Sequence, residues 1–511
     1  MPLVKIYGSA VFGVDATTIT VEVHMDKGIG YHLVGLPDSA VKESSYRIAA
    51  ALKNSGYNFP GKRITVNMAP ADLRKEGSAY DLTLAIGILI GSGQLQASEI
   101  EQFIVMGELS LDGSLQPIRG ALPIAIKAKA DGFKGFLLPI QNAAEAAIVA
   151  GFDVYGISNL SEIVGFLSGQ LSLTPQQPQI AVPQEHELER DLDFADVKGQ
   201  EGIKRCMEIA AAGGHNIILI GPPGSGKTML AKRLPSILPE MSLQEALETT
   251  KIHSVAGKVK SAGLISRRPF RSPHHSCSSA ALVGGGSFPQ PGEISLAHNG
   301  VLFLDELPEF KREVLEVMRQ PLEDREVTIS RAKFTITYPA SFMLVASMNP
   351  SPGGYFNDTN AVVSSSTNEM LRYMSKISGP LLDRIDLHIE VSPVPFENLS
   401  DKRPAESSAA IRERVRMARE RQHKRYESVI DVHYNAQMST RLIREFCALD
   451  ESSLYLLKSA MERLNLSARA YDRILKVART IADLDGSEQI APMHIAEAIQ
   501  YRSLDREGWL G

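Results

Sequence analysis

The sequence predicts an α/β protein with three folded segments. Residues 1–169 alternate strand-like and helical stretches, as in an α+β domain. Residues 191–395 place short apolar strands between helical stretches, which is typical of a parallel sheet covered on both faces. Residues 396–511 are almost entirely helical in pattern. The length of 511 residues agrees with three segments, since a domain takes about 100–200 residues.

Composition excludes several classes of protein. The formal net charge is −5, with 54 Lys and Arg against 59 Asp and Glu, so any nucleic-acid contact must be local. The longest apolar run, residues 82–90, is far shorter than the roughly 18 residues that a membrane span needs. The first residues show no signal-peptide pattern, and the three cysteines are isolated. We therefore expect a cytoplasmic protein with no membrane partner and no disulfide framework.

The joints between the segments are visible in the sequence. In the first segment, alternation predicts strands at 18–23 and 63–67, and helical spacing predicts a helix over 39–54. Residues 170–190 hold three Pro and five Gln without an apolar period, which is typical of a linker. Helices are predicted in the last segment at 408–427, 439–447, 451–464, 468–484 and 492–503.

A glycine-rich loop follows the apolar strand predicted at 216–221. The loop reads Gly221, Pro222, Pro223, Gly224, Ser225, Gly226, Lys227 and Thr228, a complete GxxxxGK[ST] pattern before a helix. Its glycines allow successive N–H groups to face a phosphate, and the helix terminus adds partial positive charge. Lys227 is expected to reach the β- and γ-phosphates, and Thr228 to ligate Mg²⁺. The loop therefore predicts a phosphate site.

A second apolar strand, 301–304, ends in Asp305 and Glu306. Open α/β sheets bind ligands at the carboxyl ends of their strands, so both carboxylates belong at the phosphate site. Asp305 is expected to hold Mg²⁺ directly or through water, and Glu306 to orient the attacking water. A solvated acidic turn is the alternative, but the presence of the glycine-rich loop favours the site.

Three further polar residues are candidates for the same site. Asn349 ends the strand predicted at 342–348 and can hydrogen-bond a phosphate or water; it can also simply form a turn before Pro350. Arg384 is the best candidate for a finger that reaches a neighbouring subunit's nucleotide, with an ion pair to a flanking aspartate as the alternative. Arg469 can touch phosphate from the helical segment, and Arg473, one turn later, is its competitor.

Together these motifs resemble an AAA+ ATPase with a helical lid. Residues 284–310 and 376–391 resemble magnesium-chelatase-like AAA+ proteins, and the similarity to the ComM/YifB family extends over nearly all of 1–507. The resemblance implies ATP and Mg²⁺ as ligands and a homo-oligomeric ring, commonly a hexamer, with ATP between subunits. It also implies helicase and branch-migration activity during integration of transforming DNA.

The sequence departs from the family at a cysteine cluster. Family members often carry four cysteines after the Asn-Pro pair, resembling a zinc knuckle. The matching positions here are Ser351, Gly353, Ser364 and Ser366. Serine hydroxyls do not replace thiolates as Zn²⁺ ligands, so no zinc is expected. Residues 351–370 are rich in Ser, Thr and Asn, and we expect them to form a mobile loop.

The first segment resembles the Lon-protease-like fold, also described as ribosomal S5 domain 2-like, over residues 107–133. In that fold a serine and a lysine form the catalytic dyad. The matching positions here are Ala79 and Leu122, so both nucleophile and base are missing and no peptidase activity is expected. Ser78 lies one position away and points in a different direction. A domain of this fold without the dyad also resembles the terminal domain of the repair protein RadA, an assembly and DNA-binding platform.

Two basic stretches are candidates for DNA contact. The stretch 251–275 contains Lys251, Lys258, Lys260, Arg267, Arg268 and Arg271 and no acidic residue. Residues 325–339 alternate polar and apolar residues around Arg331 and Lys333, which predicts a β-hairpin with two cations at its tip. Such a tip could follow a phosphate backbone. A solvated basic face is an equally good interpretation of any single residue.

The leading hypothesis is therefore a ring-forming Mg·ATP-hydrolysing motor that acts on single-stranded or branched DNA. A chelatase-type or chaperone-like ATPase that remodels protein is the alternative, because the two share the same ATPase core. A Lon-like protease is disfavoured by Ala79 and Leu122.

Overall fold

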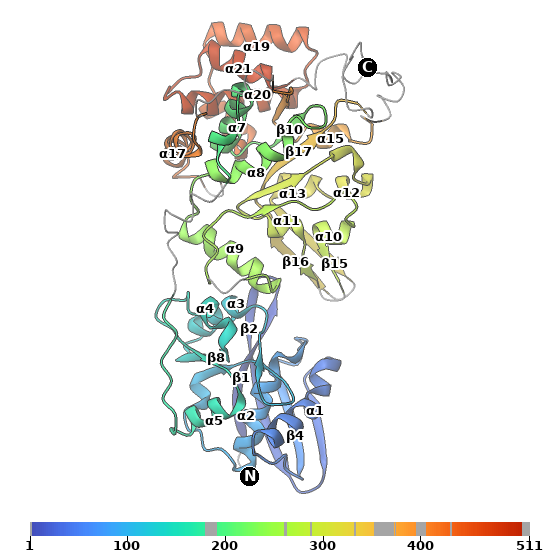
Figure 1. Ribbon diagram of the computed structural model, residues 1–511, viewed down its shortest axis with the longest axis vertical. Helices are drawn as coiled ribbons and strands as arrows, with labels where there is room; N and C mark the ends of the chain where they lie inside the picture. Colours follow the sequence, from blue (N-terminus) through green and yellow to red (C-terminus); the bar gives the residue numbers. More distant parts are fainter. Residues whose placement is uncertain are drawn as a thin grey trace. The chain divides into compact units, whose positions relative to one another are not determined.

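The computed structural model forms two compact units (Figure 1). It describes residues 3–178, 192–259, 263–286, 289–331, 334–351, 373, 375–394, 405–429 and 432–502. The first unit comprises Met1–Val182 together with Ser242–Ser266, and the second comprises Pro183–Met241 together with Arg267–Gly511. Among the described residues, no helix is long and apolar enough to cross a lipid bilayer.

The first unit is built on a mixed seven-stranded sheet in the order β3-β4-β2-β1-β5-β8-β9. The strands β1 and β2 form a long antiparallel hairpin, with Val4 opposite Val23 and Phe12 opposite Asp15. Their buried and exposed residues largely alternate, as expected for strands with one face on a core. The strands are β1 (Val4–Phe12), β2 (Asp15–Asp26), β3 (Gly30–Val34), β4 (Arg63–Ala69), β5 (Phe103–Val105), β8 (Gly135–Pro139) and β9 (Asp153–Ile157).

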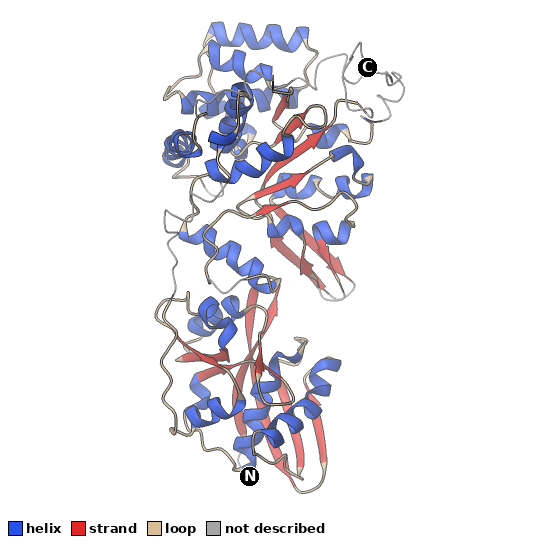
Figure 2. Ribbon diagram, in the orientation of Figure 1, coloured by secondary structure: helices blue, strands red, loops and turns tan. Residues whose placement is uncertain are grey.

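Helices pack against this sheet (Figure 2). The predicted helix over 39–54 is confirmed as α1 (Ser39–Asn54), which begins where the Asp38 carboxylate accepts a hydrogen bond from the N–H of Val41 at 2.8 Å. The apolar run 82–90 lies in α2 (Asp81–Ser92), whose residues 81–89 are all buried. This run is therefore a core helix. The remaining helices include α3 (Ala121–Ala130), α4 (Ile140–Ala146) and α5 (Leu160–Leu167).

One helix of the first unit comes from a distant part of the chain. In sequence, α9 (Leu243–Val255) lies within the predicted ATPase segment, but its contacts are with α3. The carbonyl oxygen of Ser254 accepts a hydrogen bond from the N–H of Gly120 at 3.1 Å, and its hydroxyl donates to the buried carboxylate of Glu145. The same carboxylate accepts from the N–H of Leu122 at 2.9 Å. Leu122, which matches the lysine position of the Lon-like dyad, is therefore fully buried beside this contact.

The second unit contains a five-stranded parallel sheet in the order β11-β14-β17-β10-β18. The three strands predicted from apolar runs are confirmed, and all their residues are buried. Since β17 lies between β10 and β14, the strand ending in Asn349 separates the glycine-rich loop from the acidic strand end. The strands are β10 (Ile217–Ile220), β11 (Phe270–Arg271), β14 (Val301–Leu304), β17 (Met343–Met348) and β18 (Leu387–Glu390).

The predicted hairpin and the predicted carboxyl-terminal helices are also confirmed. The strands β15 (Glu326–Arg331) and β16 (Phe334–Pro339) pair antiparallel from Glu326 opposite Pro339 to Arg331 opposite Phe334. The helices lie together at one end of the second unit, in orange and red in Figure 1. They are α17 (Ser408–Arg425), α18 (Thr440–Phe446), α19 (Glu451–Arg463), α20 (Ala468–Leu484) and α21 (Pro492–Gln500).

Polar side chains join this helical segment to the amino-terminal ends of the parallel strands. His215, directly before β10, contacts Asp386 Oδ2 through Nδ1 at 3.1 Å and Thr480 Oγ1 on α20 through Nε2 at 2.8 Å. Asp386 also accepts from Arg473 Nη1 at 2.8 Å. After α21 the chain returns to the sheet, where the N–H of His388 donates to the carbonyl oxygen of Tyr501 at 2.8 Å.

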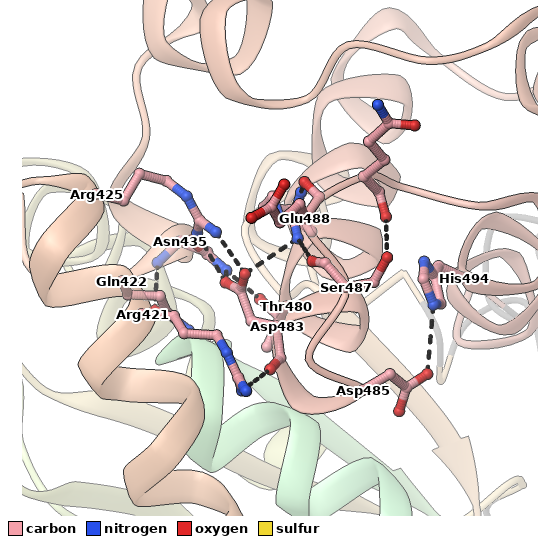
Figure 3. Close-up of polar contacts among 12 residues, drawn as sticks. Arg421, Gln422, Arg425, Asn435, Thr480, Asp483, Asp485, Ser487, Glu488 and His494 are labelled. Carbon is pink, nitrogen blue, oxygen red and sulfur yellow. Dashed lines mark hydrogen bonds and ion pairs between the residues drawn. The ribbon is translucent and has the colours of Figure 1, made fainter.

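Asp483 is the centre of a buried polar cluster within the helical segment (Figure 3). Its carboxylate accepts two hydrogen bonds from Arg425 on α17 and one from Asn435 at 2.8 Å. Arg479, one turn earlier on α20, lies 3.2 Å from the same carboxylate. Because Asp483 is fully buried, these donors replace the water that the carboxylate loses on folding.

The first prediction concerns this cluster. The substitution Asp483→Asn should destabilise the second unit by about 3 kcal/mol, because it leaves two partly buried guanidinium groups without their carboxylate. The measurement is the shift in the urea midpoint of the full chain, monitored by hydrogen exchange in α17 and α20. Asp485→Asn is the matched control, since Asp485 is about one-third exposed and should shift the midpoint far less. Equal shifts in both variants would contradict the assigned role of Asp483.

Candidate active site at the carboxyl edge of the parallel sheet

The glycine-rich loop joins β10 to α8 (Lys227–Ile237) at the carboxyl edge of the sheet. Gly224 and Gly226 have φ angles of 78° and 93°, which residues with a side chain rarely adopt. A Cβ atom on Gly221 would lie 2.2 Å from the carbonyl oxygen of Val391. The path of the loop therefore requires glycine, and the amino terminus of α8 directs its partial positive charge toward the loop.

The donors of this loop suit a phosphate ligand. The ammonium group of Lys227 donates to the carbonyl oxygens of Gly221 at 2.7 Å and Pro222 at 2.9 Å, and to Oδ1 of Asn349 at 3.2 Å. Burial lowers the pKa of Lys227, and two nearby carboxylates oppose that shift. The buried hydroxyl of Ser225 has no hydrogen-bond partner in the described part of the chain. Phosphate oxygens could satisfy both groups, because the present partners of Lys227 are neutral.

Asp305 connects the loop helix to the neighbouring strand. Its Oδ2 accepts a hydrogen bond from Thr228 Oγ1 at 2.9 Å, and its Oδ1 accepts from the hydroxyl of Ser347. The hydroxyl of Ser347 in turn accepts from the N–H of Glu306 at 3.1 Å. A hydroxyl and a carboxylate in contact are oxygen ligands of the kind that Mg²⁺ prefers, so the residues fit this ion.

Glu306 extends beyond the strand in an unusual backbone conformation. Its φ and ψ angles are 54° and 53°, a left-handed conformation that is uncommon for a residue other than glycine. Its side chain is about half exposed, and Oε2 lies 3.8 Å from Nδ1 of His275. The ring of His275 packs on the ring of His274, with 4.1 Å between centroids. The turn therefore holds this carboxylate outside the sheet, beside a ring that can donate a hydrogen bond.

Arg384 is nearly buried and makes its contacts away from the loop. Its guanidinium group donates to the carbonyl oxygen of Pro380 and to the carboxylate of Glu323. The flanking carboxylates are engaged elsewhere, Asp383 with Arg469 at 2.9 Å and Asp386 with Arg473 at 2.8 Å. The ion pair to a flanking aspartate, considered as the alternative role of Arg384, is therefore replaced by one to Glu323.

Arg469 and Arg473 occupy different environments on α20. The side chain of Arg469 is about two-thirds exposed, and its ion pair with Asp383 is a surface contact. The side chain of Arg473 is less exposed and is bound to the fully buried Asp386. Arg469 is thus the more easily released of the two for a contact with nucleotide.

The candidate DNA residues also divide into groups. Arg271 makes a bidentate contact with Glu293 at 2.6 and 2.7 Å, and Arg268 donates to main-chain oxygens, so both already support the fold. Arg267 and Arg331 are exposed. Lys260 and Lys333 lie outside the described residues. Lys251 and Lys258 belong to the first unit, whereas Arg267, Arg268 and Arg271 belong to the second.

The positions that match the family's cysteine cluster are described only in part. Ser351 is buried, whereas Gly353, Ser364, Ser366 and most of the predicted loop 351–370 lie outside the described residues. In the described part of the chain, no group of three or more His, Cys, Asp and Glu side chains is arranged to hold a metal ion.

Three residues of this region were not anticipated from the sequence. Ser347 is a polar residue in an otherwise apolar strand, and that interruption was a usable signal. His275 gave no specific signal, because only the tertiary fold brings it beside Glu306. Glu323 gave no signal, because it lies 61 positions before Arg384 and only the tertiary fold brings the two together.

Comparisons with known proteins identify the family. Three family models match this chain. The model described as subunit ChlI of Mg-chelatase matches residues 21–142, and the one described as magnesium chelatase, subunit ChlI, matches residues 193–399. The model of the ChlI C-terminal part matches residues 405–502. Competence protein ComM of Haemophilus influenzae is 46% identical, with 99% of this chain and 98% of the relative covered. The chain belongs to the ComM/YifB family of magnesium-chelatase-like AAA+ ATPases.

Other relatives place this ComM/YifB protein within the wider group. The uncharacterized protein YifB of Escherichia coli K12 is also 46% identical, over 99% of this chain and 98% of its own. The chloroplastic magnesium-chelatase subunit ChlI of Nicotiana tabacum is 23% identical, over 72% of this chain and 82% of its own.

The second prediction concerns Glu306. The substitution Glu306→Gln should lower the ATP turnover number by about 10²–10⁴-fold and leave ATP binding intact, because it removes only the carboxylate that is predicted to orient water. Turnover and binding of a fluorescent ATP analogue are measured separately. Lys227→Ala serves as the contrasting variant and should lose binding, whereas Lys232→Ala, exposed on the same helix, should change neither quantity. A normal turnover number in Glu306→Gln would refute the assignment.

Proposed function

We propose that this protein is a ring-forming motor that hydrolyses Mg·ATP and acts on DNA, as a helicase or branch-migration factor in recombination or natural transformation. The observation that carries the ATPase part is the contact between Thr228 on the loop helix and Asp305 on the acidic strand end. The DNA part is supported by the basic hairpin β15–β16 and by the relative that bears the name competence protein.

Each residue of the ATP site has a distinct role in this proposal. The loop N–H groups and Lys227 bind phosphate oxygens, and Asn349 hydrogen-bonds the γ-phosphate or the attacking water. Thr228 and Asp305 hold Mg²⁺, which neutralises charge on the phosphates when bound. Glu306 orients and polarises the attacking water. Phosphoryl transfer depends mainly on the positioning of the reactants and on stabilisation of charge. These residues include groups for both tasks.

The ring supplies one further charge from a neighbouring subunit. Arg384 contacts Glu323 rather than its own phosphate loop, which supports a role in trans. Within a ring, the guanidinium group would leave Glu323 and stabilise the charge on the phosphoryl group of the adjacent subunit. Arg469 would contact the nucleotide from the helical lid.

DNA contact is assigned to the exposed cations. Arg331 ends β15 next to the tip of the hairpin, and Lys333 and Arg267 are the further candidates. Arg268 and Arg271 contribute only if their present contacts are given up.

A chelatase-type or chaperone-like remodeller is the second candidate. The match to the magnesium chelatase subunit ChlI over all three parts of the chain favours it. Its target would be a protein, so DNA would leave the ATPase rate unchanged.

The third prediction separates these candidates. Forked or single-stranded DNA should raise the ATPase rate of the wild-type protein, and salt should suppress this effect because phosphate contacts release counterions. Arg331→Gln should weaken DNA binding and reduce the slope of log K against log salt by about 1. Arg416→Gln is the control, since Arg416 pairs with Glu413 and Glu420 on the surface of α17. If no polynucleotide changes the rate, the remodeller is favoured instead.

The fourth prediction tests the contribution in trans. Arg384→Ala should remain folded but lose turnover, and its addition to wild-type protein should lower activity more than dilution alone, because mixed rings contain incomplete sites. Glu323→Gln is the matched control. It breaks the same ion pair but keeps the arginine, so it should retain turnover. Additive activity in the Arg384→Ala mixtures would exclude the proposed role.

A further inference from the structure

A polar cavity lies at the amino ends of the parallel strands, on the sheet edge opposite to the phosphate loop. Its lining includes Asn216 before β10, Gly300 before β14, Met343 at the start of β17 and Asp386 before β18. The space open to the centre of a water molecule is about 80 Å³. That is room for about five to eight ordered waters at roughly 10–15 Å³ each, or for one small oxyanion.

Positive charge dominates this lining. The lining residues include four arginines and a single carboxylate, that of Asp386. Two arginines lie in connecting segments, Arg268 before β11 and Arg325 at the end of α13 (Arg319–Asp324). The other two, Arg419 on α17 and Arg473 on α20, belong to the helical segment. Convergence of charges from elements that are distant in sequence is a property of the folded unit, not of a basic stretch of chain.

Neutral partners orient two of these guanidinium groups. Arg268 donates to the carbonyl oxygens of Pro239 at 2.7 Å and Asn299 at 2.8 Å. Arg419 lies over the ring of Tyr434, with 3.6 Å to the centroid. These contacts fix the orientation of the two guanidinium groups.

The carboxylate of the cavity is already engaged. Asp386 accepts from Arg473 Nη1 at 2.8 Å, from the N–H of Asn216 at 3.3 Å, and contacts His215 at 3.1 Å. Burial alone would raise the pKa of Asp386, but the charge of Arg473 holds it well below its usual range. Among the described residues, Nη1 is the only nitrogen of Arg473 with a hydrogen-bond partner, so its other donors can face a ligand.

Lys476 lies next to the cavity lining and is affected by two of the lining arginines. Lys476 donates to the carbonyl oxygen of Ala436, a lining residue, at 3.0 Å. Burial lowers the pKa of Lys476 to about 8, and the charges of Arg473 and Arg325 add to the shift. The carboxylates of Asp386 and Asp472 oppose the shift.

We propose that this cavity is a second anion site that binds a phosphate-type oxyanion, distinct from the ATP site. A guanidinium group matches phosphate through parallel N–H donors, and the cavity has the volume for one such group. A space of about 80 Å³ has room for one small anion but not for a continuous stretch of DNA backbone. This site lies at the other edge of the sheet and does not depend on the proposed motor function.

The test uses the full chain with Lys227→Ala, so that the phosphate loop does not contribute. Titration calorimetry with inorganic phosphate and with pyrophosphate should show saturable binding of about one anion per chain. Adding Arg325→Gln should weaken this binding by about tenfold or more, the usual effect of losing one charge-assisted hydrogen bond. Adding Arg416→Gln, which removes a surface arginine outside the cavity, should leave it unchanged.

A second measurement needs no substitution of a cavity residue. In the Lys227→Ala protein, phosphate should slow amide hydrogen exchange in residues 434–437, which line the cavity in part. Absence of saturable binding, equal affinity with and without Arg325→Gln, or unchanged exchange at 434–437 would each overturn the proposal. Binding of a single-stranded oligonucleotide that depends on Arg325, without binding of phosphate, would also overturn it and assign these arginines to DNA.

Discussion

The carboxyl ends of β10, β14 and β17 meet at one edge of the parallel sheet, and the candidate ATP site depends on this convergence. The strands deliver Lys227 and Thr228, Asp305 and Glu306, and Asn349 to a common region. Because β17 lies between the other two strands, its residue Ser347 can bind Asp305 and the main chain of Glu306 together. The acidic pair is therefore positioned by a strand that carries no charge of its own.

The opposite edge of the same sheet is joined to the helical segment by buried polar groups. His215 contacts both Asp386 and Thr480, and Arg473 reaches Asp386 from α20. Asp386 is two positions after Arg384, so the turn that carries the candidate trans-acting arginine is also the turn to which the helices attach. Removal of one partner from a buried ion pair leaves the other charge uncompensated, so this joint depends on all of its members.

Ala79 and Leu122, the positions where a Lon-protease-like fold would carry its catalytic groups, are apolar residues of the first unit. Leu122 is fully buried, and its N–H is bound by Glu145, which also accepts from Ser254 of α9. The segment between α8 and β11 therefore contributes a helix to the first unit. The two units are connected by the chain near residues 182, 241 and 266, and the last two connections flank α9.

The sequence by itself determined the elements whose signal is local. The glycine-rich loop, the apolar strands that end in Asp305 and Asn349, the hairpin β15–β16 and the five carboxyl-terminal helices follow from spacing and periodicity over a few residues. The tertiary structure alone decided which distant groups meet. Strand order and packing between residues far apart in the chain bring Ser347 to Asp305 and Glu323 to Arg384. They also place α9 in the first unit and gather four arginines around one cavity. No local pattern encodes such contacts, because each is the outcome of many weak interactions summed over the whole fold.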